Sequence, residues 1–120
     1  MKLIVAGGRD IGFPHGDELV QKAFDGLEWG EFVTGVIHGG AKGIDSAAGR
    51  YFDGWMDVEE VRADWDLHGR AAGPIRNRVM AEKADALLAI WDGKSRGTAS
   101  MIRIAKELGL IVHVVIAEKD

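Results

Sequence analysis

The 120-residue chain has no cysteine, which excludes disulfide bonds, thiolate catalysis and cysteine zinc sites. It also has no apolar run close to the roughly 20 residues that a membrane-spanning helix needs. The apolar residues that follow Met1 and Lys2 stop at Gly7, which is too short for a signal peptide. These absences predict a cytoplasmic protein with no membrane partner.

Basic residues are also in short supply. Lys and Arg number 15 against 19 Asp and Glu, so the formal net charge is −4. A protein dedicated to nucleic acid usually carries a basic excess, so this balance argues against nucleic acid as the main partner. A local basic patch is still compatible with it, and the candidates are Arg70, Arg76 and Arg78.

Strand-like and helix-like segments alternate along the chain. Strands are predicted at residues 2–6, 32–38, 57–62, 86–91 and 110–116, and helices at 16–27, 43–52, from about 72, and 97–108. An irregular stretch is expected at 63–70. This order predicts one α/β domain over residues 1–120, a Rossmann-like three-layer domain with a mostly parallel sheet of about five strands.

Glycine is abundant, with 17 residues, and it gathers in three turns that each follow a predicted strand: AGGRD at 6–10, HGGAKGID at 38–45 and DGKSRGT at 92–98. In a parallel sheet these turns emerge at the carboxyl edge, where α/β sheets bind ligands. Glycine permits close backbone approach, and helix N-termini favour anions. A phosphate-bearing ligand is therefore expected. The candidate contacts are Gly7, Gly8, Arg9, Asp10, Gly39, Gly40, Ala41, Lys42, Gly43, Asp45, Arg76, Asn77, Asp92, Gly93, Ser95, Gly97 and Thr98.

The second turn is the sharpest local signal, because it joins a strand to a helix. Its N–H groups can cradle a phosphate with Lys42 adding charge, or its glycines simply make a tight turn and Lys42 is solvated. The spacing matches neither GxxxxGK[ST] nor GxGxxG. Asp45 lies in the first helical turn, where it either caps the helix or contacts the ligand.

The other candidates carry similar alternatives. Ser95 and Thr98 offer hydroxyl groups to a phosphate or cap a helix. Arg76 and Arg78 face opposite ways on their helix, so only one is expected to point into the cleft.

The Asp10, Asp64, Asp66 and Asp92 carboxylates lie on predicted loops, and no Asp, Glu or His spacing matches a metal motif. Trp65 is a candidate for stacking on a base, whereas Trp91 is expected to pack in the core.

The order strand-AGGRD, strand-HGGAKGID, then GRAAGPIRNRVMAEKADALLAIWDGKSRGT resembles the SLOG superfamily. That group joins the Smf/DprA DNA-processing proteins and the LOG cytokinin-activating hydrolases, and the small stand-alone YspA-like (YpsA-related) branch is most similar. The resemblance covers nearly the whole chain. It implies a nucleotide-type ligand, for which an ADP-ribose-type compound is one candidate, and a homo-oligomer.

The resemblance also departs from the LOG pattern at one position. LOG hydrolases carry a GGxGTxxE turn whose glutamate serves catalysis, and Met101 stands at that place here. Three hypotheses therefore stay open. The first is a nucleotide binder, such as a sensor, and the second is a nucleotide-processing hydrolase that uses Asp10, Asp45 or Asp92. The third is a DprA-like module that binds single-stranded DNA.

Overall fold

The computed structural model describes residues 1–11 and 15–117. Its five strands form one sheet with the order β3-β2-β1-β4-β5, and every neighbouring pair is parallel. The predicted α/β, Rossmann-like class is therefore confirmed, with a sheet that is parallel throughout. The strands are β1 (Lys2–Gly7), β2 (Gly35–His38), β3 (Asp57–Glu60), β4 (Ala86–Trp91) and β5 (Ile111–Ile116).

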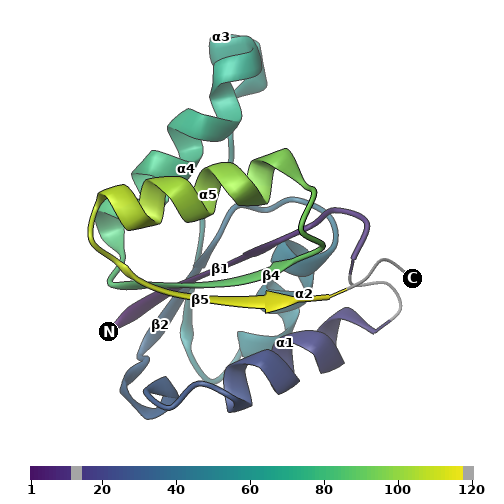
Figure 1. Cartoon of the computed structure of the whole chain (residues 1–120), viewed down its shortest axis with the longest axis vertical. Helices are drawn as coiled ribbons and strands as arrows, with labels where there is room; N and C mark the ends of the chain where they lie inside the picture. Colours follow the sequence, from purple (N-terminus) through teal and green to yellow (C-terminus); the bar gives the residue numbers. More distant parts are fainter. Residues whose placement is uncertain (12–14, 118–120) are drawn as a thin grey trace.

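Helices cover both faces of this sheet. Helices α1 (Gly16–Asp25) and α2 (Ile44–Phe52) lie on one face, and α4 (Ala72–Lys83) and α5 (Arg96–Glu107) lie on the other (Figure 1). The short helix α3 (Trp65–His68) precedes α4 and projects beyond the sheet at the top of Figure 1. The result is the three-layer arrangement that parallel strands require, because both of their faces must be covered.

The central strands are apolar along their whole length, which explains their position. Residues 3–5 and 86–90 have no exposed surface. Because successive side chains of a strand point to opposite faces, Leu3 and Val5 pack with Phe52 in one core, whereas Ile4 packs with Met80 in the other. The two cores fix α2 and α4 on opposite sides of β1.

Several predicted boundaries were wrong. Strand β2 begins at Gly35, because Gly30–Phe32 forms a 3₁₀ turn that leaves Phe32 exposed. Strand β3 ends at Glu60. The stretch expected to be irregular contains α3 and a 3₁₀ turn at Gly69–Ala71. Helix α3 begins there because the Asp64 carboxylate accepts a hydrogen bond from the Leu67 N–H at 3.0 Å, as an N-cap residue does.

The loops after the strands pack directly on one another. Residue Gly7 at the end of β1 is level with Ile90 of β4, so the loops that follow them start side by side. Gly43 precedes α2 with a φ of +80°, and a Cβ there would lie 2.4 Å from the Gly8 carbonyl oxygen. Only glycine fits this position, where the second glycine turn rests against the first loop.

We expect Gly43→Ala to destabilise the protein by at least about 2 kcal/mol, since the added Cβ meets both an unfavourable φ and the backbone of the first loop. Gly109→Ala is the matched control. Gly109 has a φ of +78° with nothing within 4 Å of an added Cβ, so it reports the conformational cost alone. Urea unfolding measures both changes. Equal losses for the two variants would contradict the packing argument.

Candidate ligand-binding site

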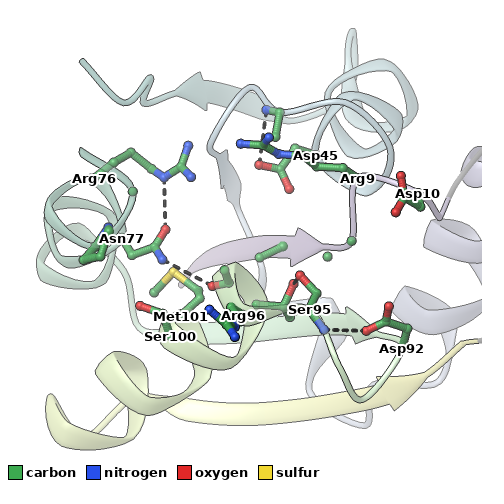
Figure 2. A pocket seen from close by; sticks show the side chains of 18 of the residues that line it. Arg9, Asp10, Asp45, Arg76, Asn77, Asp92, Ser95, Arg96, Ser100 and Met101 are labelled. Carbon is green, nitrogen blue, oxygen red and sulfur yellow. Dashed lines mark hydrogen bonds between the residues drawn. The ribbon is translucent and has the colours of Figure 1, made fainter. Parts of the chain in front are cut away.

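A cavity of about 560 Å³ opens at the carboxyl edge of the sheet, and we call it the main cavity. It lies where the loops after β1 and β4 meet the first turns of α4 and α5 (Figure 2). This is the crevice at which the strand order reverses, the usual ligand position in open α/β sheets. Twelve of the predicted contact residues line it: Gly7, Gly8, Arg9, Asp10, Ala41, Asp45, Arg76, Asn77, Asp92, Ser95, Gly97 and Thr98.

A second cavity of about 360 Å³ adjoins the main one. It is lined by Arg9, Gly39, Gly40, Ala41, Lys42, Arg62, Ala63, Trp65 and Arg76, of which Arg9, Ala41, Trp65 and Arg76 also line the main cavity. The predicted residues Gly39, Gly40 and Lys42 therefore belong to this second cavity alone. Gly43 and Gly93 line neither of the two cavities.

The second glycine turn is held by hydrogen bonds within the protein. The buried Asp45 carboxylate accepts from the backbone N–H of Gly39 at 3.0 Å and, at 3.4 Å, from that of Ala41. The N–H of Gly40 donates to His38 Nδ1 at 3.0 Å. These three N–H groups are already engaged, so the turn acts mainly as a scaffold. The capping interpretation of Asp45 was wrong: the N-cap residue of α2 is Gly43, without a side-chain capping bond, and the Asp45 carboxylate instead holds the turn that precedes the helix.

Arg76 is fixed by this scaffold. Its Nη1 donates to the Gly39 carbonyl oxygen at 2.7 Å, and its Nε donates to Asn77 Oδ1 at 3.0 Å. A Cβ on Gly39 would lie 2.4 Å from Arg76 Nη1, so the absence of a side chain at Gly39 is what admits the guanidinium. Arg78, in contrast, is exposed and lines neither cavity.

Electrostatics favour an anion in the main cavity. Burial lowers the pKa of Arg76, the nearby Asp45 raises it, and the like charge of Arg9 lowers it again. Arg9 also lines this cavity, and its side chain is exposed. Four cationic side chains line the cavity against three acidic ones, although the protein has a net charge of −4. The cations are Arg9, Arg76, Lys94 and Arg96, and the acids are Asp10, Asp45 and Asp92.

Burial raises the pKa of Asp45 to about 6. The Arg76 guanidinium and the backbone N–H groups of Ala41, Gly39 and Gly7 favour the charged form and offset part of this rise. The charge of the cavity wall thus depends on pH near neutrality, and the cavity becomes more positive when Asp45 takes up a proton.

The N-terminus of α5 forms one wall of the main cavity. Ser95 is the N-cap residue but makes no side-chain capping bond, and the first helical bond runs from the Ala99 N–H to the Ser95 carbonyl oxygen at 3.1 Å. The loop before it is shaped by Asp92 Oδ1, which accepts from the N–H groups of Lys94 and Ser95 at 2.8 Å each. A helix N-terminus without a side-chain cap favours an anion near its first-turn N–H groups, and here it lies at the cavity wall.

Two further residues near the N-terminus of α5 line the main cavity. A Cβ on Gly97 would meet nothing within 4 Å, so no protein contact requires glycine at this cavity-lining position. Within residues 1–11 and 15–117, Ser100 Oγ is the buried side-chain polar atom with no hydrogen-bond partner, and Ser100 also lines the cavity.

The two tryptophans behave differently. Trp65 is 50% exposed and lines both cavities, so its stacking on a base stays a prediction. Trp91 packs against the core, and its indole N–H donates to the Ser95 carbonyl oxygen at 3.1 Å. Met101 is buried in the main cavity wall, at the position where the resemblance to LOG hydrolases calls for glutamate.

The sequence interpretation missed some of the lining residues, including Gly73, Pro74, Met80, Lys94, Arg96 and Ser100. Gly73 and Met80 lie on α4, which carries Arg76, so a helical projection around Arg76 would have indicated Met80.

Over the described part of the chain, no three His, Asp or Glu side chains gather as metal ligands. None of the helices described there is both long and apolar enough to cross a membrane.

One similar protein is the gene 61 protein of Mycobacterium phage D29, which is 40% identical over 84 residues. The aligned region covers 64% of this chain and 67% of that protein. The chain belongs to the same family as this phage protein. No protein-family model matches the chain, and no solved structure matches it.

The raised pKa of Asp45 predicts a pH-dependent stability. The folded state holds the Asp45 proton up to about pH 6, whereas the unfolded chain releases it near pH 3.8. The stabilisation from this proton is therefore complete below pH 3.8 and is lost as pH rises through about 6. Relative to Asp45→Asn, we expect the free energy of unfolding of the wild type to fall by roughly 2–3 kcal/mol across this window.

Urea unfolding of both proteins at half-unit steps between pH 4 and 7.5 measures this difference. The Asn variant removes the titration and serves as the reference at each pH. A wild-type advantage that grows as pH rises would show that the folded protein holds Asp45 ionised throughout.

Proposed function

We propose that this protein binds a small phosphate-bearing nucleotide in the main cavity. The observation that carries the proposal is the N-terminus of α5, which lines the same cavity as the guanidinium groups of Arg9 and Arg76. Helix N-termini and arginine side chains are two of the main ways in which proteins bind phosphate. Their convergence at the strand-order reversal supports an anionic ligand at this edge of the sheet.

The rest of the cavity supports a nucleotide rather than inorganic phosphate. Its volume of about 560 Å³ lies within the range of small-molecule sites. Its wall includes apolar surface from Met80, Met101 and Pro74, and the Trp65 ring borders it. A phosphate at α5 would leave this apolar surface for a base or a sugar, and nucleotides of the ADP-ribose type contain both.

Binding without turnover is favoured over hydrolysis. Met101 cannot donate or accept a proton, and it occupies the position of the LOG glutamate. Asp92 is engaged in shaping its loop through the N–H groups of Lys94 and Ser95. Asp45, which was proposed for hydrolysis together with Asp10 and Asp92, is engaged with the N–H groups of Gly39 and Ala41.

Single-stranded DNA is the weaker candidate, because two of the three arginines proposed for it, Arg70 and Arg78, line neither cavity. The test is a thermal-shift panel followed by titration calorimetry at two salt concentrations. The panel contains nucleoside monophosphates, dinucleotides, ADP-ribose and single-stranded oligonucleotides, with product analysis for turnover. Stabilisation by a small nucleotide supports the proposal. Stabilisation by oligonucleotides alone, lost at high salt, would replace it with nucleic-acid binding.

Gly97 offers a variant that separates binding from folding. We expect Gly97→Leu to weaken nucleotide binding more than tenfold, because the side chain would project into the space beside the α5 N-terminus. The melting temperature should stay level or rise, since leucine favours a helix over glycine by up to about 1 kcal/mol. Calorimetry and thermal melting measure the two effects.

The matched control is Gly26→Leu at the end of α1, where an added Cβ meets nothing closer than 3.5 Å. This variant should bind like the wild type. Undiminished binding to Gly97→Leu would place the phosphate elsewhere.

A variant of Arg76 tests whether its guanidinium contributes to the proposed phosphate site. We expect Arg76→Gln to weaken nucleotide binding by roughly tenfold or more, since a charge-assisted hydrogen bond contributes about 1.5–3 kcal/mol. Arg70→Gln removes a nearby exposed arginine that lines neither cavity, and it should bind like the wild type. Calorimetry at fixed ionic strength compares the two. A similar loss in both variants would indicate a general charge effect and not a direct contact.

A further inference from the structure

The second cavity is more uniformly positive than the main cavity, which is lined by both cationic and acidic side chains. The charged side chains that line it are all cationic: Arg9, Lys42, Arg62 and Arg76. Arg62 pairs with Glu60 through Nε and Oε2 at 2.5 Å, so part of its charge is already compensated. The exposed Lys42, at the centre of the second glycine turn, remains as a cation that lines this cavity and not the main one.

The two cavities are joined by shared walls. Arg9, Ala41, Trp65 and Arg76 border both of them. A guanidinium carries five N–H donors, and the bonds of Arg76 to Gly39 and Asn77 occupy two of them. Its remaining donors can serve anionic groups on either side. The boundary between the cavities is therefore a region that favours negative charge.

The distance between the second glycine turn and the N-terminus of α5 follows from the order of the strands. The second glycine turn follows β2, α5 follows β4, and β1 lies between these strands. Neighbouring strands are about 4.8 Å apart, so the ends of β2 and β4 are separated by roughly 10 Å. Two phosphate groups carried on opposite sides of one sugar can reach toward both of these positions, whereas adjacent phosphates of a diphosphate are much closer together.

We propose that the two cavities together bind one nucleotide that carries two phosphate groups separated by its sugar. One phosphate lies at the N-terminus of α5, and the other lies in the second cavity beside Lys42, with Arg9 and Arg76 between them. This inference rests on the proposed function, because the first phosphate occupies the site described above. It adds a second anion-binding position and a preferred class of ligand, the nucleoside bisphosphates.

Titration calorimetry with the 5′-monophosphates and 3′,5′-bisphosphates of adenosine and guanosine tests this proposal. The proteins are the wild type, Lys42→Gln and, as a charge-matched control that lines neither cavity, Lys22→Gln in α1. For the better nucleoside, we expect the wild type to bind the bisphosphate roughly tenfold more tightly than the monophosphate. Lys42→Gln should weaken bisphosphate binding by roughly three- to tenfold and change monophosphate binding by less than about twofold.

The outcomes separate the two proposals. Equal affinity of the wild type for both ligands, or an equal loss for both ligands in Lys42→Gln, would overturn the second phosphate position and leave the proposed function standing. An equal effect in Lys22→Gln would overturn it as well, by showing a long-range charge effect. Failure of every mono- and bisphosphate to bind, in a protein that melts cooperatively, would overturn both proposals. A preference for oligonucleotides over bisphosphates would overturn this inference in favour of a polynucleotide.

Discussion

The buried carboxylate of Asp45 is the constraint on which both cavities depend. It lies in the first turn of α2, yet it accepts hydrogen bonds from the N–H groups of Gly39 and Ala41 on the preceding turn. Folding the turn back on its own helix in this way leaves the Gly39 carbonyl oxygen to receive Arg76. One acidic side chain thus determines where the principal cation of the site is placed.

Burying Asp45 and Arg76 disfavours the charged form of each side chain. Burial disfavours the charged form of Asp45 strongly enough that its pKa rises to about 6, although Arg76 and three backbone N–H groups favour that form. Burial and the like charge of Arg9 likewise disfavour the charged form of Arg76 and lower its pKa. Two hydrogen bonds, to Gly39 and Asn77, hold the Arg76 side chain in place. Groups with perturbed pKa values gather at functional sites more often than elsewhere, and a nearby anion would favour the charged form of Arg76.

The sequence was sufficient for the fold because the central strands are uniformly apolar and the helices alternate with them. It was less informative about the site. The pattern GGAKGID indicated a phosphate cradle, but glycines also occur where side chains approach the backbone closely, and Gly39 and Gly43 have this second role. Periodicity along one segment cannot show which distant carboxylate occupies a turn's N–H groups. Ser100 and Met80 were missed because they carry no motif and reach the cavity only through the packing of α5 and α4.

The charge distribution also bears on which ligand the site can accept. A cationic cavity in a protein of net charge −4 attracts an anion that fits inside it, while the net negative charge of the whole protein disfavours a long polyanion that would extend beyond it. At physiological ionic strength charges are screened beyond about 8 Å, so the proposed nucleotide would interact mainly with the charged side chains that line the cavity. The same local cations therefore favour a compact ligand, and the cationic second cavity extends this preference to a nucleotide with a second phosphate.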